Sequence, residues 1–457
     1  MMKVLMLGWE YPPHISGGLG VACDGLTKAL SKQEVDITFL FPFSQGNEDV
    51  THMRLIGTNS SKKVDKNDTV SHFKGSSSGT NPASYSSSKE RTQVRKIAVP
   101  SQLLPYVNEN DYQKLYLKHQ KWIESEKFKA NQNNLASEER KRHYSPDLFK
   151  EVENFASRAL KQSEELDFDI VHAHDWMTFP AAMRIAKKLK KPLVVHIHSL
   201  EYDRSPYGGD ERIREVEKQG MQFANLVITV SQYTKTRVHH FYKIANEKIF
   251  PIYNGSERNH LKSIKSEVQL KEKQKKTKHI LYLGRVTYQK GTKYFFESII
   301  NLLKSRDDVK VTIAGDGDEL EYFKYLTLKE GLLNRIDFPG FVDNQTRSQL
   351  FEDADLYVMP SVSEPFGLSA VEAIDNSVPT IITNQSGVAE ILPNTLRYNF
   401  WDTQKLTTLM NDLLDFPEVR RVMTQRALRD TVNVSWKRCA SLVKQSYKAT
   451  INATNAN

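Results

Sequence analysis

Short apolar runs alternate with helix-like segments along much of the chain. The first run covers 2–8; a Gly-rich turn, an amphipathic segment at 19–32 and a second apolar run at 35–41 follow it. This order predicts a β-loop-α-β start. From residue 168 the alternation resumes, with strands and helices expected in turn at 168–173, 176–190, 192–198, 209–223, 225–230, 231–240 and 248–255.

A second series of apolar strands, each followed by a helix-like segment, begins after the lysine-rich stretch at 261–278. Its predicted strands are 279–284, 310–315, 335–340, 355–360 and 379–384. Nearly continuous apolar strands that alternate with helices are typical of parallel sheets covered on both faces. The pattern therefore predicts an α/β protein with two doubly wound, Rossmann-like domains and a cleft between them.

The composition of 43–165 differs from that of the two β/α series. Residues 59–91 are rich in Ser, Lys and Asn and contain almost no large apolar residues, so they cannot bury a core and are expected to be disordered. We therefore treat 43–165 as a variable insertion. The expected domains are 1–255, 256–435 and a C-terminal helix at 436–457.

The bulk composition is that of a globular protein, with 39% hydrophobic and 26% charged residues among 457. No apolar run approaches the ~20 residues of a membrane span, and the N-terminal apolar core from Val4 to Leu7 is too short for a signal peptide. These features predict a cytoplasmic protein. Cys23 and Cys439 match no metal-binding spacing and are expected to be reduced thiols.

The charge balance, 64 basic minus 55 acidic residues, gives a net charge of +9. In a chain of this length the excess suits an anionic small ligand or peripheral contact with an anionic membrane. No module that interleaves aromatic and basic residues is present, so nucleic acid is not an expected partner.

In open α/β sheets, ligands bind where the strands end, so the residues after each strand are the candidates for function. The first strand is followed by Gly17 and Gly18, whose main-chain N–H groups would let a phosphate approach closely. The alternative is a tight turn without a ligand. The dinucleotide fingerprint fails, because Cys23 stands where its third glycine is required, so a dehydrogenase is disfavoured.

Two strands end in His-x-His, at His172 with His174 and at His196 with His198. Such a pair lies on one face of a strand and can bind a metal ion, but only Asp175 is available nearby as a further ligand. The favoured interpretation is that one histidine of each pair packs in the sheet while the later one reaches a ligand. The Asp-x-Asp matches at 316–318 and 353–355 also lack a second ligand, so no metal is expected.

The second domain supplies cations and carboxylates after its strands. Arg285 and Lys290 follow one strand and could converge on a diphosphate; a salt bridge at a helix start is the alternative. Glu364 lies on the turn "SEPFG" and Glu372 in the helix after it. Carboxylates accept hydrogen bonds from sugar hydroxyls and repel phosphate, so these positions would sort the two ends of a nucleotide-sugar.

These features occur together in one chain: the Gly-Gly-Leu turn at 17–19, His174-Asp175-Trp176, His198, Arg285 with Lys290, and Glu364 with Glu372 around Pro-Phe-Gly. Together they resemble the retaining nucleotide-sugar glycosyltransferases of the GT-B fold. The nearer match is family four, or group 1, with glycogen and starch synthases as relatives. The resemblance covers about 2–42 and 166–450 and leaves out 43–165.

The resemblance implies roles for the candidate residues. Arg285 and Lys290 would hold the donor diphosphate, and Gly17 and Gly18 would touch the same phosphates from the first domain. Glu372 would bind the ribose.

It further implies that Glu364 binds the hydroxyls of the donor sugar, and that Phe366, Gly367 and Leu368 lie along the donor. His198 would sit over the transferred sugar, with Asp175 nearer the sugar or the acceptor. The C-terminal helix would cross back onto the first domain.

Two positions depart from bacterial glycogen synthases, which carry Lys where Ile15 stands and Cys where Phe366 stands. Both departures favour the family-four pattern and a UDP-sugar, UDP-glucose above all, over an ADP-sugar. The prediction is a hexosyltransferase of polysaccharide biosynthesis that passes a glucosyl unit to a glycan or another hydroxyl acceptor without a cofactor. The alternatives are a sugar-nucleotide epimerase and a non-catalytic nucleotide-sugar-binding protein. No motif identifies the acceptor or the oligomeric state.

Overall fold

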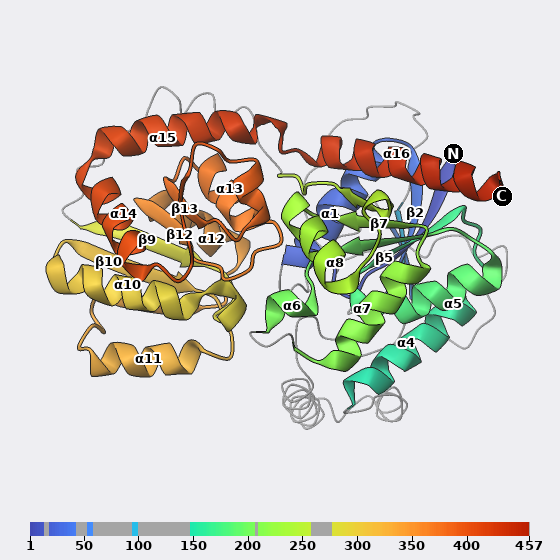
Figure 1. The fold of residues 1–457 in the computed structure, drawn as a ribbon, viewed down its shortest axis with the longest axis horizontal. Coiled ribbons are helices and arrows are strands. Elements are labelled where there is room, and N and C mark those ends of the chain that lie inside the picture. Colours follow the sequence, from blue (N-terminus) through green and yellow to red (C-terminus); the bar gives the residue numbers. More distant parts are fainter. Residues whose placement is uncertain are drawn as a thin grey trace, which may run out of the picture.

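A computed structural model describes residues 1–12, 18–42, 53–57, 94–98, 147–205, 209–256 and 277–456, with 53–57 and 94–98 described by their backbone alone. The expected disorder of 59–91 and the expected linker up to 276 lie outside these residues. Figure 1 shows two α/β domains beside each other, with the last helix crossing from the second domain onto the first.

The first domain is built on an eight-stranded parallel sheet in the order β3-β4-β2-β1-β5-β6-β7-β8. The strand order reverses at β1, where Val4 lies opposite Ile37 of β2 and Ile170 of β5. The strands are β1 Met2–Leu7, β2 Val35–Phe41, β3 Met53–Gly57, β4 Val94–Ala98, β5 Ile170–His174, β6 Leu193–Ile197, β7 Leu226–Thr229 and β8 Ile249–Pro251.

Two of these strands were not predicted. β3 and β4 come from the segment treated as a variable insertion, yet they extend the sheet at its β2 edge. A five-residue strand shows little periodicity, and a long polar segment separates β3 from β4 in the sequence, so nothing there indicates that they pair. Part of 43–165 therefore belongs to the sheet of the first domain.

Helices cover both faces of this sheet, as the apolar strands require. Helices α1 and α16 pack on each other on one face, and α4, α5 and α7 cover the other (Figure 1). The helices of this domain are α1 Gly18–Ser31, α4 Leu148–Ser163, α5 Phe179–Leu189, α6 Glu201–Arg204, α7 Glu211–Phe223 and α8 Gln232–Tyr242, with the 3₁₀ turn η1 Trp176–Thr178.

The second domain has a six-stranded parallel sheet in the order β11-β10-β9-β12-β13-β14. Its strands are β9 Lys278–Leu283, β10 Val309–Ala314, β11 Ile336–Gly340, β12 Leu356–Met359, β13 Thr380–Thr383 and β14 Leu396–Tyr398. Its helices are α10 Thr292–Ser305, α11 Leu320–Lys329, α12 Asn344–Asp353, α13 Leu368–Asp375, α14 Thr403–Asp415 and α15 Pro417–Asp430, with the 3₁₀ turns η3 Tyr288–Lys290 and η4 Gly387–Glu390. Separate apolar cores lie on its two faces.

The final helix, α16 Trp436–Asn455, continues from α15 and packs on α1 of the first domain (Figure 1). Its residues Trp436, Cys439, Val443 and Tyr447 join the core of that domain. None of the helices in the described ranges is long and apolar enough to cross a membrane.

Helix α16 docks closely on α1 because α1 carries a glycine at the contact. A Cβ atom at Gly25 would lie 2.2 Å from Cε2 of the Trp436 indole, well inside van der Waals contact. The large side chain of one helix therefore occupies the place of a missing side chain on the other.

We expect Gly25→Ala to lower the free energy of unfolding of the first domain by roughly 1–3 kcal/mol, because the indole must move to admit a methyl group. Chemical denaturation followed by tryptophan fluorescence measures this change. Gly18→Ala is the matched control in the first turn of α1, where a Cβ would meet only Leu368 Cδ1, at 3.9 Å. Equal losses in the two variants would contradict the role given to the Trp436 contact.

Candidate active site

The centre of the candidate site is an ion pair between the loops that follow β9 and β12. Lys290 Nζ lies 2.7 Å from an Oε of Glu364, and Ser361 Oγ donates to the same carboxylate at 3.0 Å. Glu364 is almost fully buried. Two charges predicted for opposite ends of a donor therefore neutralise each other in the structure.

Close main-chain packing holds these two loops together. Gly291 has a φ of 68°, and a Cβ there would lie 2.0 Å from the carbonyl oxygen of Pro360, so only glycine fits. The carbonyl of Gln289 accepts from the main-chain N–H of Val362 at 2.9 Å, and the Gln289 side chain donates to Ser363 O at 3.2 Å. The position of Lys290 is thus tied to the backbone of the loop that carries Glu364.

Arg285 comes from the same β9 loop as Lys290. Its guanidinium donates to the side chain of Gln289 at 2.8 Å, and its carbonyl accepts from the Tyr282 hydroxyl at 2.5 Å. Arg285 therefore lies before the η3 turn, and Lys290 is the last residue of that turn. Lys290 is paired with Glu364, so the salt-bridge alternative from the sequence describes its partner in this structure. The binding of a diphosphate by Arg285 and Lys290 stays a prediction.

Helix α13 begins at the end of the Glu364 loop. Gly367 precedes it with a φ of 117°, a left-handed conformation that glycine adopts without strain, and Phe366 is buried beneath the turn. Leu368, the first residue of α13, lies close to Gly18 of the first domain. Gly17 and Ile15 lie outside the described residues. The N-terminus of α13 thus meets the N-terminus of α1.

Glu372 is the fifth residue of α13 and is partly buried. Its carboxylate lies 3.5 Å from Arg347 of α12. Burial raises the pKa of Glu372, the nearby Asp375 raises it further, and the Arg347 guanidinium lowers it. Glu364 has a lysine partner and Glu372 an arginine partner, so the two glutamates have separate environments.

His198 and Asp175 meet at the ends of β6 and β5. Asp175 Oδ1 accepts the main-chain N–H of His198 at 2.7 Å and that of Ser199 at 3.4 Å. The positive φ of Asp175, 56°, turns its buried carboxylate toward this backbone, and burial raises its pKa to about 7. The resemblance implies a place for Asp175 nearer the sugar or the acceptor, and this stays a prediction. In the structure its carboxylate binds the main chain of His198.

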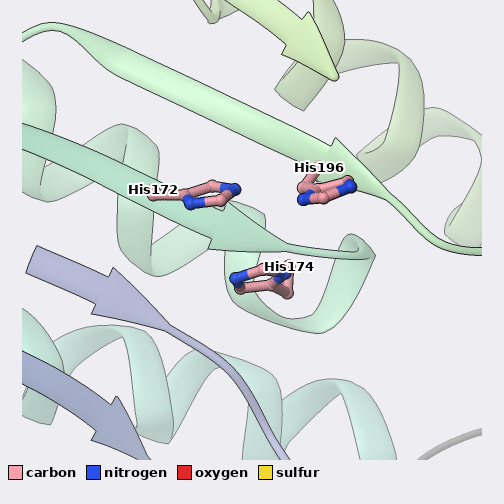
Figure 2. Close-up of side chains that lie close together, drawn as sticks. All are labelled: His172, His174 and His196. Atoms are coloured by element: carbon pink, nitrogen blue, oxygen red, sulfur yellow. The ribbon is translucent and has the colours of Figure 1, made fainter. Parts of the chain in front are cut away.

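The two His-x-His pairs come together on adjacent strands, and Figure 2 shows three of these rings on one face of the sheet. Nitrogens of His172, His174 and His196 lie within 4.8 Å of one another. The rings of His172 and His196 are stacked at 10°, and the ring of His174 is tilted against them by 37° and 31°. These three side chains could hold a metal ion, so the expectation that no metal is needed stays a prediction.

Hydrogen bonds link the histidine column, which consists of His172, His174, His196 and His198, to its surroundings. His172 Nδ1 lies 2.5 Å from the Tyr447 hydroxyl of α16, and His174 Nδ1 lies 2.9 Å from His198 Nε2. The sequence analysis expected the later histidine of each pair to reach a ligand, but His174 is fully buried and only His198 keeps some exposure. How deeply the end of a strand is buried depends on the elements that cover it, and the sequence pattern does not show this.

The Asp-x-Asp matches serve the backbone. Asp316 accepts from the main-chain N–H of Gly317 at 2.8 Å, and Asp355 accepts from that of His279 at 2.8 Å. Each of these carboxylates therefore binds a main-chain N–H, Asp316 that of its neighbour Gly317 and Asp355 that of a residue in β9.

The sequence analysis missed the residues that join the two domains around the site. Asp203 of α6 accepts from Ser363 Oγ at 2.7 Å and pairs with Arg237 at 2.7 Å. Glu390 of the second domain accepts from the first main-chain N–H groups of α8, at 2.9 Å from Gln232 and 2.5 Å from Tyr233. Such long-range contacts leave no local pattern in a sequence.

Known proteins match most of the chain. Residues 124–259 match the family described as Glycosyltransferase Family 4, and residues 263–430 match Glycosyl transferases group 1. The chain belongs to these glycosyltransferases. The glycosyltransferase is 27% identical, over 417 residues, to an uncharacterized glycosyltransferase of Methanocaldococcus jannaschii, covering 86% of this chain and 83% of the relative. It is 25% identical over 462 residues to a glycogen synthase of Mycobacterium tuberculosis, covering 98% and 95%.

Solved structures share its fold. A sucrose-phosphate synthase from Thermosynechococcus elongatus has a TM-score of 0.70 at 16% identity, covering 99% of this chain and 100% of its own. HepE of Anabaena, in complex with UDP-glucose, has a TM-score of 0.64 at 16% identity, covering 98% and 100%. The predicted family and the predicted GT-B, two-domain α/β fold are confirmed; the domain boundaries and the roles of the site residues stay predictions.

Proposed function

We propose that this glycosyltransferase moves a glucosyl unit from UDP-glucose to a glycan hydroxyl with retention of the anomeric configuration. The observation that carries the proposal is the Lys290–Glu364 pair, 2.7 Å apart, with Arg285 in the same β9 loop. A diphosphate needs cations and a sugar needs carboxylate acceptors. HepE in complex with UDP-glucose and a glycogen synthase relative support the choice of donor and acceptor.

The ion pair suggests how the binding of the donor would change the partners of Lys290 and Glu364. Without donor, Glu364 neutralises Lys290 in a nearly buried place, so neither charge is left unpaired. A diphosphate that reaches Lys290 competes with Glu364 for its ammonium group. Glu364 is then free to accept hydrogen bonds from the hydroxyls of the sugar. Arg285, whose guanidinium stays charged, would share the phosphate charge with Lys290 as the bond to the leaving nucleotide breaks.

Retention requires the acceptor to attack from the face of the leaving group or a covalent intermediate to form. Glu364 is held by Lys290 and Ser361, and this favours a role in binding the sugar over one as a nucleophile. The departing phosphate oxygen would take the acceptor's proton as the new glycosidic bond forms. His198, at the edge of the first domain, would face the transferred sugar.

The remaining proposals concern the setting of the reaction. We infer that the acceptor is a growing polysaccharide and that the reaction takes place in the cytoplasm, with contact to an anionic membrane surface as a further possibility for the basic chain. An epimerase of the same fold would convert the sugar-nucleotide without an acceptor, and a binding protein would leave it intact.

Release of UDP from UDP-glucose, measured with and without an α-glucan, tests the proposed function. We expect UDP release that depends on the α-glucan and lengthens it. Conversion of the sugar without an acceptor would indicate an epimerase, and binding without turnover would indicate a silent protein. ADP-glucose and GDP-glucose in parallel reactions test the choice of nucleotide.

Loss of either glutamate should have a different kinetic effect. Glu372→Ala should raise the donor KM more than it lowers kcat, because the ribose that it would hold hardly changes during transfer. Glu364→Ala should lower kcat on the order of 10²-fold, since its bonds to the sugar would strengthen in the transition state. Steady-state kinetics against donor measure both. A kcat defect confined to Glu372→Ala, or a glycosyl adduct trapped on Glu364, would overturn this assignment.

Transfer should need no divalent metal, because Arg285 and Lys290 supply the cations that a diphosphate requires. We expect EDTA to leave the initial rate of UDP release unchanged, and added Mg²⁺ or Mn²⁺ to raise it less than about two-fold, as for a rate controlled by fixed side chains. Abolition by EDTA with restoration by either ion would refute this proposal.

A further inference from the structure

Two consecutive residues at the end of β5 hold His198. Asp175 binds its main-chain N–H at 2.7 Å, and His174 Nδ1 faces its ring Nε2 at 2.9 Å. One contact fixes the backbone of His198 and the other fixes its imidazole. The orientation of His198 therefore depends on where β5 ends.

The hydrogen bond between the two rings restricts where their protons lie. Burial lowers the pKa of His174 to about 3 and that of His198 well below its usual range, so both imidazoles are neutral at neutral pH. Each neutral ring carries one N–H, and the bond uses the proton of only one of them.

The buried surroundings of His174 indicate which ring is the donor. His174 Nε2 is buried and has no hydrogen-bond partner among the described residues. A buried N–H without a partner is rarer and more costly than a bare acceptor nitrogen. The favoured arrangement is therefore His174 Nδ1–H donating to His198 Nε2, which leaves the proton of His198 on Nδ1.

We propose that His174 is a positioning residue that fixes the tautomer and ring orientation of His198, so that His198 offers an Nδ1–H donor to the transferred sugar. This inference rests on the proposed function, which places His198 at the sugar. His198 begins the segment that leads to Asp203, and Asp203 binds Ser363 next to Glu364. The positioned ring therefore belongs to the chain segment that contacts the donor-side loop.

Both uncharged and ionisable groups surround the two rings, and the pKa of Asp175 among them is raised to about 7. Burial raises the pKa of Tyr447 and that of Cys23, so both side chains stay protonated. The titratable and charged groups around His174 and His198 are His172 and His196 on the same face, Asp175 after β5, Arg204 of α6, and Tyr447 of α16 and Cys23 of α1 from the covering helices.

The test is the pH profile of kcat for His174→Leu in the full chain. We expect kcat to fall on the order of 10- to 100-fold, the range for a misplaced reacting group, with the donor KM changed less than about three-fold. Without His174, His198 Nε2 loses its hydrogen-bond donor and one of the neighbouring rings that lower the pKa of His198, so this pKa should rise, while burial still keeps it below its usual value. The protonation of Asp175, whose pKa is about 7, is common to both proteins, so kcat should fall more steeply below pH 7 in His174→Leu than in the wild type.

Two further variants separate positioning from packing. His174→Asn should restore most of kcat and the wild-type pH profile, because the Asn amide nitrogen can take the place of Nδ1 and donate to His198. His172→Leu is the matched control: it lies on the same strand and face, is equally buried, and hydrogen-bonds Tyr447 instead of His198. It should keep the wild-type profile.

Thermal unfolding by circular dichroism verifies that each variant is folded, and ¹⁵N shifts of labelled His198 report its tautomer directly. A folded His174→Leu with the kcat and the pH profile of the wild type would overturn the proposal, as would equal defects in the His172 and His174 variants or a His198 proton on Nε2 in the wild type. If the wild type transfers no sugar, the proposed function fails, whereas the tautomer measurement still decides the positioning by His174.

Discussion

The ion pair between Lys290 and Glu364 organises the site of this glycosyltransferase. It joins the loops after two neighbouring strands, β9 and β12, whose carboxyl ends meet because the sheet is parallel. The pair is nearly buried, so each charge needs the other until a ligand replaces it. The close approach of Gly291 to Pro360 keeps the two loops in register, and the ion pair has little freedom to separate without a ligand.

The same β12 loop also forms the junction between the domains. Pro365 O accepts from Ser231 Oγ of the first domain at 2.5 Å, and Ser363 donates to Asp203. Gly387 leaves room for this contact, since a Cβ there would lie 2.5 Å from Ser231 Cβ. A single loop therefore carries both Glu364 and the contacts to the first domain, so the candidate site and the domain junction lie on the same residues.

Burial determines the chemistry of the first-domain side. The histidine column lies between the sheet and α16, where desolvation keeps the imidazoles neutral and makes their hydrogen bonds depend on tautomer. Asp175 is buried below the main chain of His198 with a positive φ, a conformation that costs energy in most contexts. The strained backbone of Asp175 and the buried side chains around it hold the end of β5 in place.

The sequence by itself determined the α/β class, the two parallel sheets and most of the strands, because apolar periodicity is local and survives in any context. It also placed Arg285, Lys290, Glu364 and Glu372 after strands of the second domain. It could not show β3 and β4, since five-residue strands separated by a long polar segment carry almost no periodic signal.

Only the tertiary structure decided which side chains meet. It paired Lys290 with Glu364, turned Asp175 toward the backbone of His198, and buried His174 completely while His198 stays slightly more accessible. The physical reason is that pairing and depth depend on strand order and on the helices that cover each strand end. These relations connect residues far apart in the chain, so no spacing along the sequence encodes them.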